Sequence, residues 1–363
     1  MNKFNLRAKL YGTAMAAILA FGLTSCDNWV YDDLDPCTVT YRLKFTYDYN
    51  MKYADAFPAE VRSVNVWAFD SEGRLAWQGK ASGASLADKD FYLTMDVAPG
   101  TYSFLAWGGL SGQDAFTVAD ATRPASMRNL GCTLNLKERV QENEDETRAD
   151  GDAPALYSDY KMMGLYHGIL DDVTLTVQET EHVVQDIVIP MMKDTKRVAV
   201  MLQHLDGSAI ERGDFSVSIE AANSLLAWDN AVLPGPEFSY TPWSVTYGQT
   251  TALTPGGDPD GTITTIASHL SELSTSRIMA DSGQRLKVRR NSDGRTIINV
   301  PFVQYLLLVK GNYNENLSDQ EYLDRMDDFS MVFFLNPNDT WYSAIGVYIN
   351  SWAVVPPQEE NDL

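Results

Sequence analysis

The chain has 363 residues, is 45% hydrophobic and 11% aromatic, and carries a formal net charge of −21. This composition is typical of a globular protein with substantial cores and excludes a disordered chain. The negative charge disfavours nucleic acid and anionic headgroups as partners, because like charges repel. The length indicates two domains.

The first 25 residues have the pattern of an export signal. Lys3, Arg7 and Lys9 are the only charged residues there, and an apolar stretch follows over 10–23. A basic start before such a stretch is typical of a signal peptide. The stretch is shorter than the roughly 20 apolar residues of a membrane-spanning helix. Loss of residues 1–25 would change the formal charge to −24, because three cations leave with them.

The end of this signal, Leu-Thr-Ser-Cys at 23–26, resembles the bacterial lipobox. In such signals the cysteine thiol receives diacylglycerol, and a peptidase then cuts before the cysteine. We therefore predict cleavage between Ser25 and Cys26 and a lipid on Cys26; the alternative is an ordinary signal peptide with a chance cysteine. Each buried methylene of an acyl chain contributes ~0.8 kcal/mol, so two or three chains hold a protein stably at a membrane.

Residues 26–37 form an acidic linker after the lipidated cysteine, with four aspartates and no basic residue. Such a stretch resembles the surface-export signals of lipoproteins in the Bacteroidetes. The alternative is a solvated linker whose charge has no special role. We expect the mature protein to be lipid-anchored in the outer membrane and exposed at the cell surface.

Two cysteines remain after lipidation, Cys37 and Cys132. An even pair in an oxidising compartment predicts one disulfide, and two buried free thiols are the alternative. The pair lies 95 positions apart, a loop for which the chain-entropy model gives roughly 4 to 5 kcal/mol of stabilisation. The pair lacks the spacing and the nearby histidines of a metal site, so no metal is expected.

Beyond residue 37, strand-like segments dominate. Alternating or apolar runs between Gly- and Pro-containing turns predict strands, whereas 319–326 has the pattern of a short helix. We predict an all-β fold of two tandem β-sandwich domains, at 38–192 and 193–363. The predicted strands are 38–47, 61–69, 74–79, 91–97, 101–107, 173–177, 183–189, 197–205, 215–221, 263–268, 285–290, 296–300, 302–310, 331–335 and 342–355.

The sequence offers no catalytic constellation. It has no nucleophile elbow, phosphate loop or dinucleotide fingerprint, so we expect no enzyme activity and no cofactor. The histidines, at 167, 182, 204 and 269, are scattered, which favours structural roles. Asp-Pro-Asp-Gly at 258–261 is a turn rather than a calcium loop, because later acidic ligands are missing. The acidic stretch 137–154 predicts an exposed loop, with a protease-accessible site at Arg148 as the alternative.

Several segments resemble the Bacteroidetes fimbrial anchor family (FimB-like, fimbrillin-associated anchor proteins). They are Cys-Thr-Val-Thr-Tyr-Arg-Leu-Lys-Phe-Thr-Tyr-Asp-Tyr-Asn-Met at 37–51, the strand at 61–70, Met-Lys-Asp-Thr-Lys-Arg-Val at 192–198, Gln-His-Leu-Asp-Gly at 203–207 and Ile-Asn-Ser-Trp-Ala-Val-Val at 349–355. Together with the lipobox they span nearly the whole chain.

The resemblance implies two transthyretin-like β-sandwich domains and a non-enzymatic role. Family members fix a fimbrium to the outer membrane and limit its length, so the expected partners are fimbrial shaft subunits, the fimbrillins. Shaft subunits of this group open a groove when a protease removes their first strand. Arg42 is the only candidate for such a cleavage here, and it lies within the first predicted strand; this favours an anchor over a shaft subunit.

A surface glycan-binding lipoprotein is the alternative function. Eight tryptophans are available to stack on sugars. Most of them, such as Trp67 and Trp107, lie in apolar strands and are expected in cores. Paired carboxylates are too common in so acidic a chain to identify a glycosidase.

Overall fold

The computed structural model describes residues 39–139, 154–176, 183–204, 206, 208–253, 263–311, 314–343 and 346–354. Within these ranges strands form four sheets, and the helices are few and short. The predicted all-β class is confirmed. A search of the described helices finds no candidate for a membrane span, by length or by apolar character.

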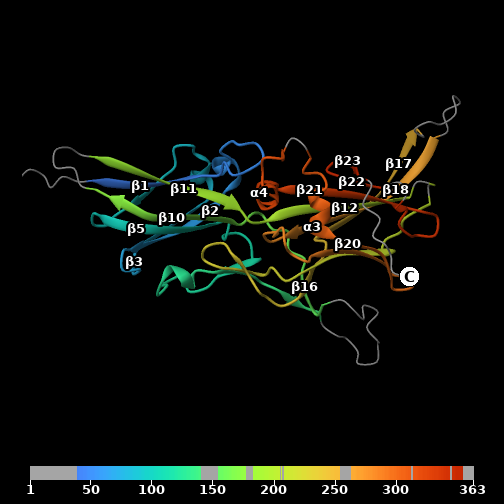
Figure 1. Ribbon diagram of the computed structural model, residues 1–363, viewed down its shortest axis with the longest axis horizontal. Coiled ribbons are helices and arrows are strands. Elements are labelled where there is room, and N and C mark those ends of the chain that lie inside the picture. The colour runs from blue at the N-terminus through green and yellow to red at the C-terminus, as the bar shows by residue number, and fades with distance from the viewer. Residues whose placement is uncertain are drawn as a thin grey trace, which may run out of the picture. The chain divides into compact units, whose positions relative to one another are not determined.

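One sheet has seven strands, all from residues 40–193, in the order β3-β2-β5-β10-β11-β1-β4 (Figure 1). In β1 every second side chain is buried, because successive side chains of a strand point to opposite faces of the sheet. Gly73, with φ of 75°, lies in the turn that leads the chain from β2 into β3. The strands are β1 (Thr40–Thr46), β2 (Ser63–Asp70), β3 (Leu75–Ser82), β4 (Leu93–Met95), β5 (Gly100–Gly108), β10 (Tyr166–Leu175) and β11 (Val184–Lys193).

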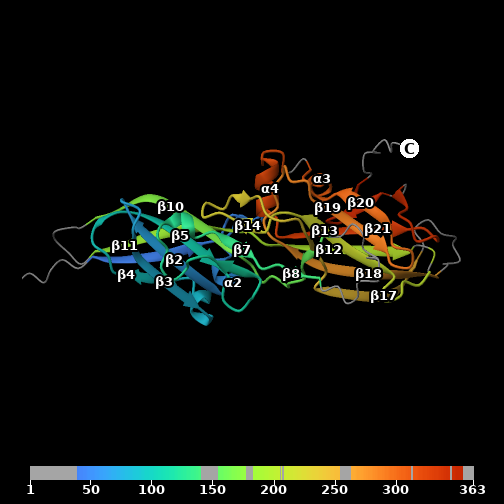
Figure 2. The same cartoon turned by 90° about the horizontal axis from the view of Figure 1, so that it is seen from below.

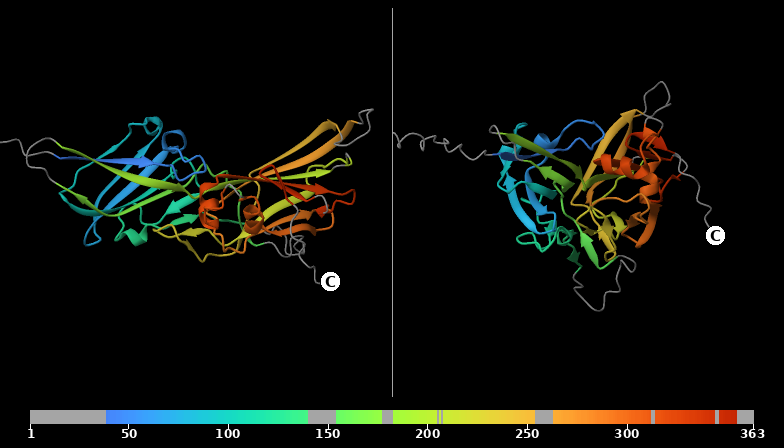
Figure 3. Two further views of the ribbon diagram at one scale, coloured as in Figure 1. Left: turned by 45° about the horizontal axis from the view of Figure 1, so that its top comes forward. Right: turned by 60° about the vertical axis from the view of Figure 1, so that its left-hand side comes forward.

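A second sheet has six strands, all from residues 196–354, in the order β17-β18-β12-β21-β22-β23. Inside it, β12 pairs antiparallel with β18 and parallel with β21. The long strand β17 pairs with β18 along the whole length of β17, and the two run together in Figure 3. The strands are β12 (Lys196–His204), β17 (Ser244–Leu253), β18 (Ile263–Thr275), β21 (Asp328–Leu335), β22 (Val347–Ile349) and β23 (Trp352–Val354).

Two further sheets combine strands from both sides of residue 193. A six-stranded sheet has the order β20-β19-β13-β16-β9-β8, and a four-stranded sheet has the order β15-β14-β7-β6. In the latter, β14 pairs with β7 (Figure 2). The strands are β6 (Phe116–Val118), β7 (Cys132–Leu134), β8 (Lys137–Glu138), β9 (Leu156–Ser158), β13 (Phe215–Ala221), β14 (Leu225–Leu226), β15 (Val232–Leu233), β16 (Phe238–Tyr240), β19 (Arg285–Arg290) and β20 (Arg295–Pro301).

The domain boundary at residue 193 stays a prediction. The chain does leave the seven-stranded sheet after Lys193 and enters the second sheet at Lys196. However, β6 to β9 precede that point and pair with later strands. One hydrophobic core also contains Trp107 together with Phe333. Both Trp67 and Trp107 are buried, as expected from their apolar strands.

The helices are short, and one of them replaces a predicted strand. The predicted helix at 319–326 is present as α4 (Asp319–Arg325), whose first turn is capped by the Ser318 hydroxyl accepting from the Glu321 N–H at 3.1 Å. The strand predicted at 302–310 is wrong, because these residues begin with α3 (Phe302–Leu307). Its buried residues recur with helical spacing, which a short apolar run hides. The remaining elements are α2 (Phe57–Glu60), η1 (Ala84–Ala87) and η2 (Met127–Asn129).

The last predicted strand, 342–355, is divided by a tight turn. Asn350 and Ser351 have φ of 48° and 70° and connect β22 to β23. Positive φ at both central residues gives the turn a twist that matches a right-handed hairpin. The described chain therefore ends in a hairpin whose outer strand, β23, forms one edge of the second sheet.

Candidate functional site

The predicted N-terminal sites lie outside the described residues. This applies to Ser25, Cys26, the linker 26–37 and Cys37. Cys132 lies in β7 as a free thiol, 1% exposed, and burial raises the pKa of that thiol far above its usual range. Lipidation at Cys26 and the Cys37–Cys132 disulfide both stay predictions.

The three described histidines are buried separately. Burial lowers the pKa of His167 and of His269 to about 4, so both are neutral at pH 7. No group of three or more His, Cys, Asp or Glu side chains in the described ranges is placed to hold a metal. His182 and the turn at 258–261 lie outside those ranges. The bonds run from His167 Nε2 to the Trp228 oxygen (2.8 Å), from His204 Nε2 to Asp339 Oδ1 (2.9 Å) and from His269 Nε2 to Ser271 Oγ (2.7 Å).

Two segments that carry the family resemblance meet in space. Tyr47, from 37–51, is fully buried and its hydroxyl donates to the Asp327 carboxylate, 3.0 Å from each oxygen. Lys193, from 192–198, lies 3.6 Å from the same carboxylate and 2.9 Å from Glu60. Asp327, which directly precedes β21, thus contacts both the residue after β1 and the last residue of β11.

Lys196 is buried to 2% exposure at the start of β12. Its ammonium donates to the main-chain oxygens of Asp324, at 2.6 Å, and Lys193, at 3.2 Å. Desolvation lowers its pKa to about 8. The Asp324 carboxylate in turn accepts two bonds from Arg277, at 3.0 and 2.8 Å. A two-pronged Arg–carboxylate pair fixes geometry as well as charge.

Asp194 is the most isolated charge in this region. It is fully buried, and its Oδ1 accepts a 2.8 Å bond from Asn230, whereas Oδ2 has no partner in the described structure. Burial raises the pKa of this carboxyl to about 7. We call Tyr47, Glu60, Lys193, Asp194, Lys196, Asn230, Arg277, Asp324 and Asp327 the junction network.

The junction network is a set of hydrogen bonds and ion pairs between distant parts of the chain. It connects β1, α2, the β11–β12 link, the β14–β15 turn, the segment after β18 and the end of α4. Buried charges rarely add net stability, but removing one partner costs roughly 3 to 5 kcal/mol. The network therefore specifies one arrangement of these elements. Sequence analysis located two of its segments through the resemblance, but not their partners.

A sheet edge near the end of the described chain is the other candidate site. Among the described residues, the backbone of β23 pairs only with β22, and an unpaired edge can accept another strand. Three large aromatic residues near it are exposed: Tyr342 at 46%, Tyr348 at 40% and Trp352 at 62%. Aromatic residues of this kind are enriched in binding hot spots.

Trp352 lies on the side of the hairpin that faces the core. It is directly opposite Ile349, so the two side chains point to the same face of the sheet. Ile349 is fully buried, whereas Trp352 is 62% exposed. The inner face of the sheet is therefore left uncovered at Trp352, whereas Val354 on the same face packs against the core. This makes the end of β23 at Trp352 a candidate surface for a partner.

Comparison with known proteins identifies relatives of the whole fold. A family model described as Mfa2, fimbrillin-A associated anchor proteins Mfa1 and Mfa2, matches residues 34–356. The chain is 31% identical over 99 residues to the minor fimbrium anchoring subunit Mfa2 of Porphyromonas gingivalis. That match covers 27% of the chain and 31% of the relative, so the chain spans less than a third of this curated relative's length.

Two solved structures are also similar. A protein of Bacteroides thetaiotaomicron, described as a proposed adhesin, has 31% sequence identity and a TM-score of 0.70, over 89% of this chain and 99% of that one. The fimbrial anchor protein Mfa2 of Porphyromonas gingivalis has a TM-score of 0.56 at 16% identity, over 88% of this chain and 99% of that one. At that identity the second likeness shows a shared fold alone.

Proposed function

The chain belongs to the family of fimbrillin-A associated anchor proteins, and from that premise we propose that it anchors a fimbrium to the outer membrane and limits the length of that fimbrium. The match of the family model to residues 34–356 is the observation that carries this proposal. As part of it, the four sheets belong to two tandem transthyretin-like β-sandwich domains. The role is structural and not enzymatic.

The membrane end of the anchor is the lipid on Cys26. The basic and apolar signal before it, and the acidic linker 26–37 after it, support export and surface display. Two or three acyl chains hold a protein stably, whereas one chain binds only reversibly. The lipid thus connects the filament to the cell.

The fimbrial end of the anchor is the β22–β23 edge. A strand from the first shaft subunit adds to the free side of β23 through main-chain hydrogen bonds. These bonds are directional, and several of them together give a strong joint. The Trp352 side chain, uncovered on the inner face, gives that strand an apolar contact. The anchor joins a shaft subunit through one edge only and carries the lipid at its other end. This also explains a limit on the length of the fimbrium, because no further subunit adds to the fimbrium beyond the anchor.

Deletion of the protein in its native cell tests the proposal. Fimbriae should then be released into the medium and should be longer than those of the parent strain. Negative-stain electron microscopy of cells and medium measures both quantities. Fimbriae of normal length that stay attached would contradict the proposal.

The glycan-binding alternative is separated by affinity electrophoresis in gels that contain polysaccharide. An anchor should migrate as it does in gels without polysaccharide. Retardation by a polysaccharide, together with attached fimbriae of normal length in the deletion strain, would favour the alternative.

A further inference from the structure

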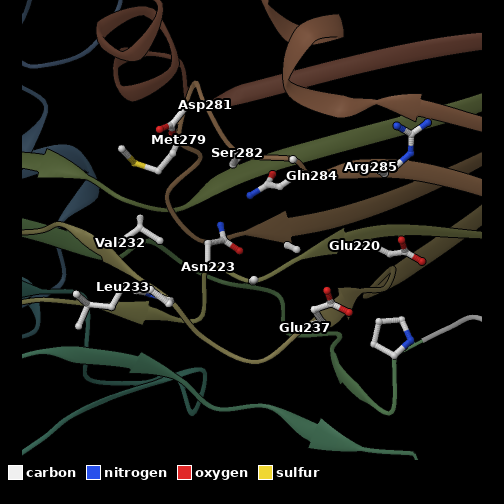
Figure 4. A pocket seen from close by; sticks show the side chains of 15 residues that line it. Glu220, Asn223, Val232, Leu233, Glu237, Met279, Asp281, Ser282, Gln284 and Arg285 are labelled. Atoms are coloured by element: carbon white, nitrogen blue, oxygen red, sulfur yellow. The ribbon is translucent and has the colours of Figure 1, made fainter.

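A cavity of about 560 Å³ lies outside both the junction network and the β22–β23 edge. Its walls come from the end of β13, from β15 and the segment that follows it, from residues 279–284 and from Arg285, the first residue of β19 (Figure 4). Pockets of roughly 300 to 1,000 Å³ with a few converging polar groups are the usual size for a bound ligand.

A buried carboxamide faces this cavity without a partner. Gln284 is 4% exposed, yet neither its Oε1 nor its Nε2 has a hydrogen-bond partner in the described structure. Figure 4 shows its amide directed toward Asn223, into the middle of the cavity. The hydroxyl of Ser282, in the same wall, is buried and equally unpaired. Buried polar groups left unpaired cost roughly 1 to 3 kcal/mol each, so a polar occupant would relieve them.

Asn223 differs from Gln284 because its amide is already used. Its Nδ2 donates to the Arg277 oxygen at 2.8 Å, and its Oδ1 accepts from the Tyr240 hydroxyl at 2.9 Å. The Asn223 amide on the opposite wall is therefore fixed by hydrogen bonds and is not available to a ligand. Gln284 is the side chain that offers one donor and one acceptor to a ligand.

The charges around the cavity favour a basic occupant. Glu237 and Asp281 line it from opposite sides in Figure 4, and neither carboxylate forms a hydrogen bond or ion pair within the described residues. The third carboxylate, Glu220, is paired with Lys287 at 2.6 Å. Arg285, the cation among the described lining residues, donates to Asn299 at 2.6 Å.

The apolar part of the cavity has the geometry of a strand edge. Val232 and Leu233 form β15, the outermost strand of its sheet, and both line the cavity. Leu233 is 44% exposed. An extended peptide can pair with such an edge and bury alternate side chains beside it. The described residues of the lining include no aromatic ring on which a sugar could stack.

From this arrangement we infer that the cavity binds an extended polypeptide segment that carries a lysine or arginine. The Gln284 carboxamide pairs with a peptide group of the ligand, since an amide supplies the matching donor and acceptor. The basic side chain reaches Glu237 and Asp281, and an apolar side chain of the ligand packs against Val232 and Leu233. This site is separate from the strand contact at β23, and its existence does not depend on that contact.

Fluorescence anisotropy with two capped peptides tests the inference on the full mature chain. One probe alternates valine and lysine, and the other alternates valine and glutamate. The lysine probe should bind at least roughly tenfold more tightly than the glutamate probe. Gln284→Leu should weaken the lysine probe by about tenfold, and the Glu237→Gln, Asp281→Asn double variant should remove the preference for lysine.

A matched control distinguishes binding in the cavity from general attraction of the lysine probe to the acidic surface. Asp90→Asn with Glu211→Gln removes two exposed carboxylates elsewhere and should leave binding unchanged. The carboxylate variants should keep the thermal unfolding midpoint of the parent, and Gln284→Leu should not lower it, because it removes an unpaired buried amide. Equal affinity for both probes, no binding of the lysine probe, or equal losses in the control and cavity variants would overturn the inference. Binding of maltoheptaose that Gln284→Leu abolishes would overturn it in favour of a saccharide.

Discussion

The hydroxyl of Tyr47 lies 3.0 Å from both carboxylate oxygens of Asp327, although 280 positions separate the two residues. Tyr47 lies in the first segment of the family resemblance, directly after β1, and Asp327 immediately precedes β21. A hydrogen bond to a charged group contributes more than one between neutral groups. This contact therefore holds together two distant parts of the chain in the described structure.

Replacing Tyr47 with phenylalanine should lower the free energy of unfolding by roughly 1.5 to 3 kcal/mol, the usual value of a hydrogen bond to a charged group. The variant keeps the aromatic ring, so the decrease in the free energy of unfolding measures the contribution of the hydroxyl. Urea unfolding measures it. Tyr342→Phe is the control, because Tyr342 is 46% exposed and its loss should fall within about 0.5 kcal/mol of zero. Equal losses in the two variants would show that the Tyr47–Asp327 bond contributes nothing.

Asp194 should give the junction network a measurable pH dependence. Burial raises its pKa from 3.8 to about 7 in the folded protein. Below pH 3.8 both states hold the proton, and the contribution to stability is fully present. As the pH rises toward 7, the unfolded chain ionises first while the folded chain keeps its proton. The free energy of unfolding therefore falls over this range, by an amount on the order of 4 kcal/mol.

Asparagine at position 194 has no titratable group, so Asp194→Asn isolates the pH dependence of stability that comes from the Asp194 carboxyl. The variant should gain stability relative to the parent between pH 4 and pH 7, and the difference should level off above that range. Urea unfolding at a series of pH values measures it. Asp90→Asn, at an exposed position, should show no such trend. A constant difference between Asp194→Asn and the parent would contradict a raised pKa at Asp194.

Local patterns predicted much of the sheet structure. The predicted 215–221 and 285–290 coincide with β13 and β19, where alternation and turn residues agree. Strands of two or three residues, such as β14 and β15, are too short to show a period and were not predicted. The run 302–310 was assigned to the wrong class, because strand and buried helix look alike over a few apolar residues.

The candidate sites divide in the same way. Lipidation at Cys26 is predicted from a local sequence signal and stays a prediction, because Cys26 lies outside the described residues. The junction network does not follow from a local signal, because Lys196 meets Asp324 across 128 positions and Asp194 meets Asn230 across 36. The cavity beside Gln284 combines β13, β15 and the segment before β19, which no spacing in the sequence brings together.

Trp352→Ala should weaken the joint with the shaft subunit without unfolding the anchor. The side chain is 62% exposed, so its loss should change the free energy of unfolding by less than about 1 kcal/mol. Loss of an aromatic hot spot costs roughly 2 kcal/mol or more of binding energy. Pull-down of purified shaft subunit measures this; Met163→Ala, 59% exposed, is the control. Undiminished capture by Trp352→Ala would exclude this edge.

The predicted disulfide has a direct chemical test. Thiol labelling of the unfolded, unreduced mature protein should find no free cysteine, because the lipid occupies Cys26 and the disulfide occupies Cys37 and Cys132. After reduction the label should appear on both. Labelling of Cys37 and Cys132 before reduction would refute the pairing and leave Cys132 as the buried thiol of the structure.

The central claim is that the lipid on Cys26 holds the fimbrium to the cell. Its most direct test is electron microscopy of cells in which Cys26→Ala replaces the native protein, with Ser25→Ala as the control that keeps the cysteine and a small residue before it. The account predicts fimbriae free in the medium for Cys26→Ala and attached fimbriae for Ser25→Ala. Fimbriae that remain attached in normal number on Cys26→Ala cells would contradict it.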